Sequence, residues 1–472
     1  MKHTSSASAS MVSSHPANDR KNAMESGSIP GLLVQLAVPA VIAQLVNLLY
    51  NVVDRIYIGH IADVGAAALT GVGLFTPILM LLDAFAMLAG AGGAPLAAIA
   101  MGQKDPARAE KILGNCFTAL LLFAAVLTAV FYAAAPWLLR LFGASDATLP
   151  YAVSYARIYV LGSVCVLIVI GMNPFITTQG FAKISMLTTL IGAVINIILD
   201  PILIFGFHLG VEGAAIATVL SQAVGAVWIL RFLTGRQTLL RLQRRFMKPE
   251  KDILLPCLGL GISTFVMMST ESLLSITFTS SLSRYGGDLA VGAMTIITSV
   301  SQLCTLPLQG ICQGGQPIIS YNYGAGLASR VKKAFSCVFT VCISYTVLFC
   351  AAVMLFPTAF AGLFTADAQL TAYTAGTMRI YMAGIFACGA QISCQQSFMA
   401  LGQAKISLLL ACLRKLILLI PLILILPHIL ASDPVSAVFL AEPVSDIAAS
   451  VVTTITFLSR FNRILQKGAK GA

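Results

Sequence analysis

Four polar residues in the first half of the chain lie within apolar stretches, and together they could bind a cation. Asp54 closes the stretch LVNLLYNVVD, and Thr218 lies in GAAIATVL. Asn196 and Asp200 are four residues apart in VINIILDP, so they share one helical face. Two carboxylates held close together either share a proton or attract a cation. The set predicts a coupling site for H⁺ or Na⁺, with Na⁺ held at Asp54, Asn196 and Asp200. The alternative is that these groups are structural contacts at helix ends.

Three more polar residues precede Asp54 in the same stretch. Asn47, Tyr50 and Asn51 lie three to four residues apart and lead to Asp54 at the same spacing, which places them on one helical face. We expect this face to contact substrate. No other metal site and no cofactor are predicted.

A second candidate site lies in the other half of the chain. Glu271 is deep in an apolar stretch, where an acid is costly and usually faces a cavity. We predict that it meets cationic substrate, with Met267 on the same face and Gln302 and Gln309 two turns apart on the next helix. A carboxyl bonded to a neighbouring helix is the alternative. Weaker candidates are Asp83, Glu442 and Asp446, with Arg414 and Lys415 as their partners.

These residues need a membrane scaffold to position them. Of the 472 residues, 58% are hydrophobic and 10% charged, and the mean hydropathy is +0.90. Soluble domains carry about 25% charged residues, so this composition excludes a soluble enzyme, a disordered protein and a coiled coil. The apolar runs predict an all-α integral membrane protein with twelve transmembrane helices, near 31–58, 66–101, 110–142, 150–178, 183–206, 213–234, 252–283, 288–323, 330–363, 370–400, 404–427 and 434–459.

The basic residues predict the orientation of the chain. Loops near 59–65, 143–149, 207–212, 365–369 and 428–433 contain no Lys or Arg, whereas most of the 29 Lys and Arg lie in the alternate loops. The positive-inside rule then places both termini in the cytoplasm of a protein in the cell inner (plasma) membrane. The net charge of +11 thus indicates topology, and no nucleic-acid partner is expected.

Polar stretches divide the chain into parts. We expect a disordered cytoplasmic tail over 1–30, a six-helix lobe over 31–234, a basic linker over 235–251, a second six-helix lobe over 252–460 and a cytoplasmic tail over 461–472. The linker, GRQTLLRLQRRFMKPEK, suits the anionic inner leaflet, so membrane lipids are expected partners.

The two halves form an internal repeat at an offset of 222 residues. Gly92, Pro95, Gly102 and Arg108 recur as Gly314, Pro317, Gly324 and Arg330. Six helices per repeat give both halves the same orientation, which is typical of secondary transporters. The same offset from Asp54, Asn196, Asp200 and Thr218 reaches Ile276, Leu418, Leu422 and Leu440. The second half lacks the polar set, which favours a functional role for it over a structural one.

The chain resembles the MATE family, the multidrug and toxic compound extrusion transporters, in its bacterial multidrug-exporter branch. The resemblance rests on LVNLLYNVVDRIYIG, VINIILDPILIFG and QGICQGGQPIISYNYGAG. It implies two six-helix lobes around a central cavity, and export of organic cations in exchange for H⁺ or Na⁺. It also implies that Asp54, Asn196, Asp200 and Thr218 match the family's amino-lobe cation site and that Glu271 matches a helix 7 acid. A further helix 10 acid of one branch is replaced here by glutamines near Ala390, which argues against a carboxy-lobe cation site.

The expected function is therefore secondary active export of cationic amphipathic small molecules by a monomer. No Walker motif is present, so ATP is not the expected energy source, and the chain is not expected to be an enzyme. Two alternatives stay open. One is a flippase for a lipid-linked precursor from the same superfamily, which would use cavity arginines such as Arg414. The other is a channel or membrane receptor, which has no need of paired halves.

Overall fold

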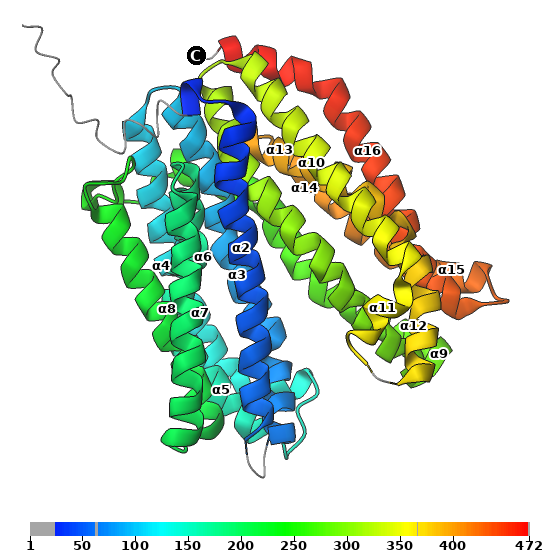
Figure 1. Ribbon diagram of the computed structural model, residues 1–472. Helices are drawn as coiled ribbons and strands as arrows, with labels where there is room; N and C mark the ends of the chain where they lie inside the picture. The colour runs from blue at the N-terminus through cyan, green and yellow to red at the C-terminus, as the bar shows by residue number, and fades with distance from the viewer. Residues whose placement is uncertain (1–23, 62–64, 366, 471–472) are drawn as a thin grey trace, which may run out of the picture.

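The computed structural model describes residues 24–61, 65–365 and 367–470. These residues form helices and no strand, in two groups that meet at the end carrying the C-terminus and diverge toward the other end (Figure 1). The prediction of an all-α protein with two repeated lobes is confirmed.

The amino lobe precedes residue 235 and the carboxy lobe follows residue 250. The amino lobe contains α2 (Ile29–Gly59), α3 (Gly65–Gly102), α4 (Pro106–Leu141), α5 (Leu149–Leu161), α6 (Ser163–Thr178), α7 (Ala182–Pro201), the π-helix η1 (Ile202–Gly206) and α8 (Gly210–Thr234). The carboxy lobe contains α9 (Lys251–Gly324), α10 (Ala328–Leu355), α11 (Pro357–Gly362), α12 (Ala368–Tyr381), the 3₁₀ turn η3 (Met382–Gly384), α13 (Ile385–Ala400), α14 (Ala404–Cys412), the π-helix η4 (Leu413–Leu419), α15 (Ile420–Ile429) and α16 (Pro434–Lys470).

The helices differ from the twelve expected spans in continuity. In the described part of the chain, nine helices are long and apolar enough to cross a membrane, or ten when the bent pair α5 and α6 counts as one. The expected helices 252–283 and 288–323 correspond to the two legs of α9, which are separated by the turn at Gly287, and the expected helix 370–400 is divided by η3. The protein crosses the membrane many times, and the number twelve stays a prediction.

The sharp turn within α9 depends on one residue. Gly287 has φ 62° and ψ −159°, a conformation open almost only to glycine because it lacks a Cβ. The two legs of α9 therefore run in different directions without an intervening loop. This turn lets one helix supply both halves of the contact with the amino lobe.

The two lobes meet through α2 and α3, which pack against α9. Glycines allow the close approach: a Cβ on Gly92 would overlap the Cys257 carbonyl oxygen, and one on Gly261 would overlap that of Leu88. Gly314, the repeat equivalent of Gly92, packs in the same way against Ala37 of α2. Small residues at helix crossings are a usual source of tight packing in membranes.

The segment 235–251 is fixed to the amino lobe. Gln179, 1% exposed, accepts hydrogen bonds at Oε1 from the Thr238 hydroxyl at 2.7 Å and from the Leu239 and Leu240 amides at 2.8 and 2.9 Å. Glu110 of α4 accepts from the Arg241 amide at 3.1 Å. The linker, which includes the 3₁₀ turn η2 (Arg244–Phe246), therefore moves with the amino lobe.

The expected disorder of the tail over 1–30 is corrected where the structure describes it. Residues 1–23 lie outside the described part, but Met24 is buried, and Glu25 accepts a hydrogen bond from the Tyr321 hydroxyl at 2.8 Å. Arg330 donates to the carbonyl oxygens of Met24 and Gly27 at 3.2 and 2.9 Å. Residues 24–30 are thus ordered against the carboxy lobe.

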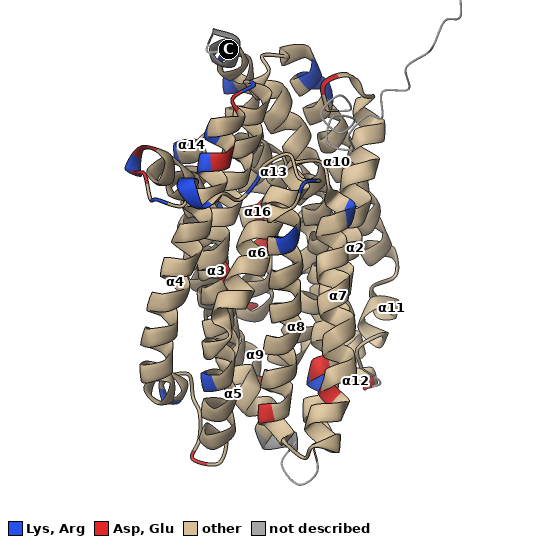
Figure 2. Ribbon diagram, turned by 90° about the vertical axis from the view of Figure 1, so that its left-hand side faces the viewer, with Lys and Arg blue, Asp and Glu red and all other residues tan. Residues whose placement is uncertain are grey.

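Lys and Arg gather toward the end where the lobes meet and the C-terminus lies (Figure 2). The opposite end carries few of them. Large apolar side chains such as Val34, Trp137 and Leu348 are exposed, as expected for helices that face lipid.

Candidate functional site

Three residues of the predicted cation set are buried together, near the C-terminal end of α7 and in the N-terminal half of α8. Asn196 and Asp200 are 1% and 0% exposed. The Asn196 amide donates from Nδ2 to Asp200 Oδ1 at 3.3 Å and to Thr218 Oγ1 at 3.4 Å. Thr218 in turn donates to the Ala214 carbonyl oxygen at 3.0 Å. The amide thus orients the carboxylate and the hydroxyl toward one point.

Asp54 reaches this cluster from α2. Its carboxyl lies within hydrogen-bonding reach of the Asp200 carboxyl. Neither carboxylate can donate while both are ionised, so a hydrogen bond between them requires a proton. The structure therefore brings together all four residues that the sequence grouped, from three different helices.

Three oxygen atoms of this cluster have no hydrogen-bond donor. Within the described part of the chain, Asp54 Oδ1, Asn196 Oδ1 and Asp200 Oδ2 are buried acceptors without a partner. Buried acceptors are nearly always satisfied, and leaving one unsatisfied costs about 1–3 kcal/mol. Three in one place suit a bound cation or a shared proton. No group of three or more His, Cys, Asp and Glu that could hold a metal ion occurs among the described residues, and hard oxygen ligands suit Na⁺ rather than a soft metal.

Pro201 and the π-helix η1 follow Asp200 directly. Proline removes a backbone donor, and a π-helical turn interrupts the regular hydrogen-bond pattern; such turns are common at functional sites. The local sequence LDPILIFG thus places Asp200 where its helix is least regular.

Tyr155 of α5 is a member of this site that sequence reasoning missed. It is buried, lies within hydrogen-bonding reach of Thr218 and interacts electrostatically with Asp54 and Asp200. Its ring packs edge-on against Phe75 with centroids 5.6 Å apart. Nothing in its local sequence distinguishes it from the other tyrosines of the chain.

The polar face before Asp54 does not join the cluster. Asn47 and Asn51 are exposed, and Asn51 donates from Nδ2 to the Asn47 carbonyl oxygen of its own helix at 2.7 Å. Tyr50 is half-buried and interacts electrostatically with Asp54 and Asp83. These residues border the cation cluster rather than contribute ligands to it.

In the carboxy lobe, Glu271 forms an ion pair with Lys415 of η4, as in the alternative of a carboxyl bonded to a neighbouring helix. Lys415 also donates to the Met267 carbonyl oxygen at 3.3 Å. The Met267 sulfur accepts from Gln395 Nε2 at 3.1 Å, and Gln391 donates to Gln395 at 2.6 Å. Gln391 and Gln395 of α13 thus connect to Met267, which lies one turn before Glu271 on α9.

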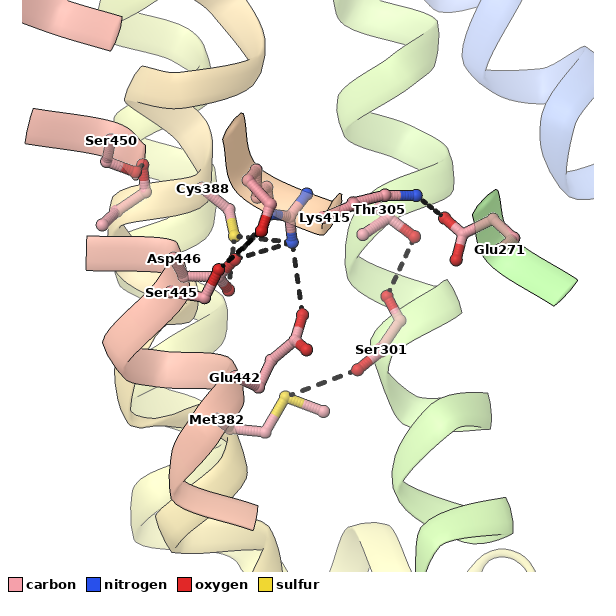
Figure 3. Close-up of polar contacts among 12 residues, drawn as sticks. Glu271, Ser301, Thr305, Met382, Cys388, Lys415, Glu442, Ser445, Asp446 and Ser450 are labelled. Carbon is pink, nitrogen blue, oxygen red and sulfur yellow. Dashed lines mark hydrogen bonds and ion pairs between the residues drawn. The ribbon is translucent and has the colours of Figure 1, made fainter. Parts of the chain in front are cut away.

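Arg414, next to Lys415, forms the second half of this network (Figure 3). Its guanidinium lies 2.7 Å from Asp446 Oδ1 and 3.3 Å from Glu442 Oε1, both on α16. The Cys388 thiol donates to Asp446 Oδ2 at 3.0 Å. Arg414 is thus a partner of Glu442 and Asp446, as expected, whereas Lys415 pairs with Glu271.

Gln302 and Gln309 lie apart from this network. Both are exposed on the second leg of α9, and no hydrogen bond of their side chains is found within the described residues. The neighbouring Ser301 instead contacts Met382, with 3.9 Å between Ser301 Oγ and the Met382 sulfur, and the Thr305 hydroxyl donates to the Ser301 carbonyl oxygen.

The two lobes place charge at different positions of the repeat. The equivalents of Glu271, Arg414, Lys415, Glu442 and Asp446 in the amino lobe are Leu49, Gly192, Ala193, Leu220 and Val224. Neither lobe retains the polar set of the other. The amino lobe holds carboxylates without a buried cation, and the carboxy lobe holds carboxylates paired with two cations.

Comparisons with known proteins agree with this architecture. The multidrug export protein MepA of Staphylococcus saprophyticus is 24% identical over 91% of this chain and 94% of its own length. MepA of Staphylococcus haemolyticus is 26% identical over 81% and 83%. A solved structure described as the outward-facing conformation of a multidrug resistance MATE family transporter of the MOP superfamily has a TM-score of 0.86 at 23% identity, covering 94% of this chain and 98% of that one.

A family model matches both halves of the chain. The MatE model covers residues 39–202 and 264–426, one stretch in each lobe, which together make up more than half of the sequence. The first stretch contains Asp54, Asn196 and Asp200, and the second contains Glu271, Arg414 and Lys415. The protein is therefore a multi-pass membrane protein that belongs to the MatE family of multidrug and toxic compound extrusion transporters.

Proposed function

We propose that the protein is a cation-coupled antiporter that exports organic, cationic amphipathic molecules by alternating access. The cluster of Asp54, Asn196, Asp200 and Thr218 binds the coupling ion, H⁺ or Na⁺. The observation that carries this proposal is the group of three buried, unpartnered oxygens on Asp54, Asn196 and Asp200. A bound cation can be ligated by all three oxygens, whereas a shared proton can bridge the two carboxyl groups.

Coupling follows from the position of the cluster in one lobe. Asp54 lies on α2, which also packs against α9 of the other lobe, whereas Asp200 and Thr218 lie on α7 and α8. An ion bound between Asp54 and Asp200 changes the position of α2 within the amino lobe. Because α2 also packs against α9, this shift changes the equilibrium between arrangements of the two lobes. A ligand shifts such an equilibrium only by its difference in affinity for the two states.

Glu271 is the proposed contact for cationic substrate. Its side chain is 55% exposed, whereas the amino-lobe cluster is buried, so a bulky ligand can reach it. Other contacts for substrate come from α9 itself: Met267 offers adaptable apolar contact, and the exposed Gln302 and Gln309 offer polar contact.

The proposed orientation places the lobe contact on the cytoplasmic side. Lys and Arg gather at that end, in agreement with the positive-inside rule (Figure 2). Both termini then face the cytoplasm, and the protein works as a monomer in the plasma membrane. The relatives reported above are named multidrug export proteins, and no observation favours a lipid flippase.

Transport in proteoliposomes tests the proposal. The purified protein should move a cationic dye uphill under an imposed H⁺ or Na⁺ gradient, with each gradient imposed separately. Asp54→Asn and Asp200→Asn should each abolish uphill movement while the protein stays folded and inserted. The control is Asp146→Asn, because the Asp146 side chain is 98% exposed in a loop, and it should transport like the wild type. Uphill export by either cluster variant at the wild-type rate would refute the coupling site, and downhill flux alone in the wild type would indicate a channel.

A further inference from the structure

We propose that Lys415 is an internal cation that occupies Glu271 until a cationic substrate displaces it, and that the released ammonium group then pairs with Glu442. Lys415 would thus set the specificity for molecules with one positive charge. This inference rests on the proposed export function and adds a mechanism by which the protein distinguishes substrates by their charge.

The first argument is the difference in exposure within the ion pair. The Lys415 side chain is 7% exposed, whereas that of Glu271 is 55% exposed. A ligand can therefore approach the carboxylate from the open side while the lysine holds it from the buried side. In Figure 3, Lys415 reaches Glu271 from within the carboxy lobe, and Glu271 ends the row of charged side chains.

The second argument is the charge balance of the network. Glu271, Glu442 and Asp446 supply three carboxylates, and Arg414 and Lys415 supply two cations. Arg414 is shared between two carboxylates, at 2.7 Å from Asp446 and 3.3 Å from Glu442. With all three carboxyls ionised, the network lacks one positive charge, and unbalanced charge in a membrane interior is costly.

A monocationic substrate completes this balance. When it pairs with Glu271, Lys415 is free to pair with Glu442, which already interacts electrostatically with both Lys415 and Glu271. Arg414 then keeps Asp446, its nearer partner, and every carboxylate has one cation. A neutral molecule leaves the imbalance in place, and a second positive charge on the substrate meets the two basic side chains.

The third argument is the backbone that carries Lys415. Arg414 and Lys415 lie in η4, a π-helical segment between α14 and α15. Such segments lack the regular hydrogen bonds of an α-helix and are frequent at functional sites. The Lys415 ammonium also donates to the Met267 carbonyl oxygen, 3.3 Å away, so it keeps one acceptor when the ion pair opens.

The fourth argument is that the fold does not require this network. The equivalent positions in the amino lobe, Leu49, Gly192, Ala193, Leu220 and Val224, are apolar or glycine, and that lobe forms the same helices. Five ionisable groups are costly in a membrane-spanning lobe, so their presence indicates a function. Recognition of substrate charge is such a function.

Equilibrium dye binding without any ion gradient tests this inference. The probes are rhodamine 6G, a monocation, and rhodamine B in its zwitterionic form, measured by fluorescence polarisation on purified protein in nanodiscs. Lys415→Gln removes the internal competitor, so rhodamine 6G should bind about tenfold more tightly, while rhodamine B should be unaffected. Glu271→Gln should weaken rhodamine 6G binding by about tenfold or more and leave rhodamine B unchanged.

A double-mutant comparison separates displacement from a structural role. Glu442→Gln removes the resting place of the lysine, so it should weaken rhodamine 6G binding in the wild type but not in the Lys415→Gln background. If Lys415→Gln does not fold, Lys415→Arg replaces it: the guanidinium can bind Glu271 with two hydrogen bonds and should weaken rhodamine 6G binding severalfold.

The outcomes distinguish this inference from the proposed function. Rhodamine 6G affinity that is unchanged in Lys415→Gln, or lowered equally with that of rhodamine B, would overturn the role of Lys415, even when the wild type exports dye uphill. The same holds for an unchanged affinity in Lys415→Arg. A wild type that neither binds nor exports a monocationic dye would overturn both proposals.

Discussion

Gly102 and Gly324, which occupy equivalent positions of the repeat, pack against each other's helix where the two lobes meet. A Cβ on Gly102 would overlap the Tyr321 carbonyl oxygen of α9, and a Cβ on Gly324 would overlap the Ile99 carbonyl oxygen of α3. The contact is therefore reciprocal, made by backbone on both sides, and lies on the symmetry axis of the repeat. Alternating access must open this contact, because it joins the ends of the lobes on the proposed cytoplasmic side.

We predict that Gly324→Ala shifts the protein away from the conformation described here. The added methyl group has no space against the Ile99 carbonyl oxygen, so α3 and α9 must move apart. Spin labels at positions 104 and 333, in the repeat-related loops, should show a longer distance distribution than in the wild type. Coupling ion should change the same distance in the wild type if the lobes move as units.

Gly259→Ala is the matched control for this change. Gly259 is also in α9, but a Cβ there meets nothing within 4 Å. It should leave the distance distribution unchanged and gain up to about 1 kcal/mol of helix stability. Equal distances in Gly324→Ala, Gly259→Ala and the wild type would show that the glycine contact does not hold the lobes together.

Arg414→Met should destabilise the carboxy lobe strongly. The change leaves Glu442 and Asp446 without their cation in the membrane interior, and breaking a buried ion pair from one side costs about 3–5 kcal/mol. Thermal unfolding in detergent should therefore show a markedly lower midpoint. The triple variant Arg414→Met, Glu442→Gln, Asp446→Asn removes all three charges and should recover most of the loss.

Arg140→Met provides the comparison for this prediction. Arg140 and Asp146 also form an ion pair, at 3.5 Å, but their side chains are 65% and 98% exposed. Exposed pairs contribute little to stability, so the midpoint should not change. A midpoint in Arg414→Met equal to that of Arg140→Met would mean that the Arg414 pairs do not stabilise the fold.

The two-lobe architecture could be predicted because the repeat is marked by glycines, which are needed where two helix backbones pack closely. Glycines such as Gly102 and Gly324 recur at one offset, and the structure shows why: they sit at the lobe contact, where no side chain fits. The grouping of Asp54 with Asn196 and Asp200 followed from their position within apolar stretches and from the absence of the polar set in the second half of the repeat.

Contacts that depend on helix rotation could not be predicted in the same way. Lys415 and Glu271 lie 144 residues apart, and nothing in either local sequence states which helix faces which. Tyr155 joins the cation cluster through α5, whose neighbours are set by packing alone. The turn at Gly287 lies where the sequence predicted a break between helices 252–283 and 288–323, but the positive φ that makes it could not be predicted from a single glycine.

Gln179→Leu should release the linker from the amino lobe. The Gln179 Oε1 atom accepts from the Thr238 hydroxyl and from the Leu239 and Leu240 amides, and leucine satisfies none of these donors. We expect a loss of about 2–4 kcal/mol, from about 1 kcal/mol or more for each lost bond. Hydrogen exchange should increase over 235–251 and not in α8. Unchanged exchange in this segment would mean that other contacts, such as the one from Glu110, are sufficient to hold it.

Asn196→Leu should distinguish Na⁺ from H⁺ as the coupling ion. Asn196 Oδ1 is a neutral oxygen ligand that can bind Na⁺ but cannot carry a proton at neutral pH, whereas Asp54 and Asp200 can do both. If the ion is Na⁺, the concentration that half-saturates transport should rise by about tenfold or more in Asn196→Leu. If it is H⁺, the variant should keep gradient-driven export with a changed pH profile, because the Asn196 donor to Asp200 is also lost. Asn173→Leu is the control, since Asn173 Oδ1 is likewise buried without a donor, but its amide donates to the Ser185 carbonyl oxygen of α7 instead of a carboxylate. A response of Asn173→Leu equal to that of Asn196→Leu would show that the effect is not specific to the cation cluster.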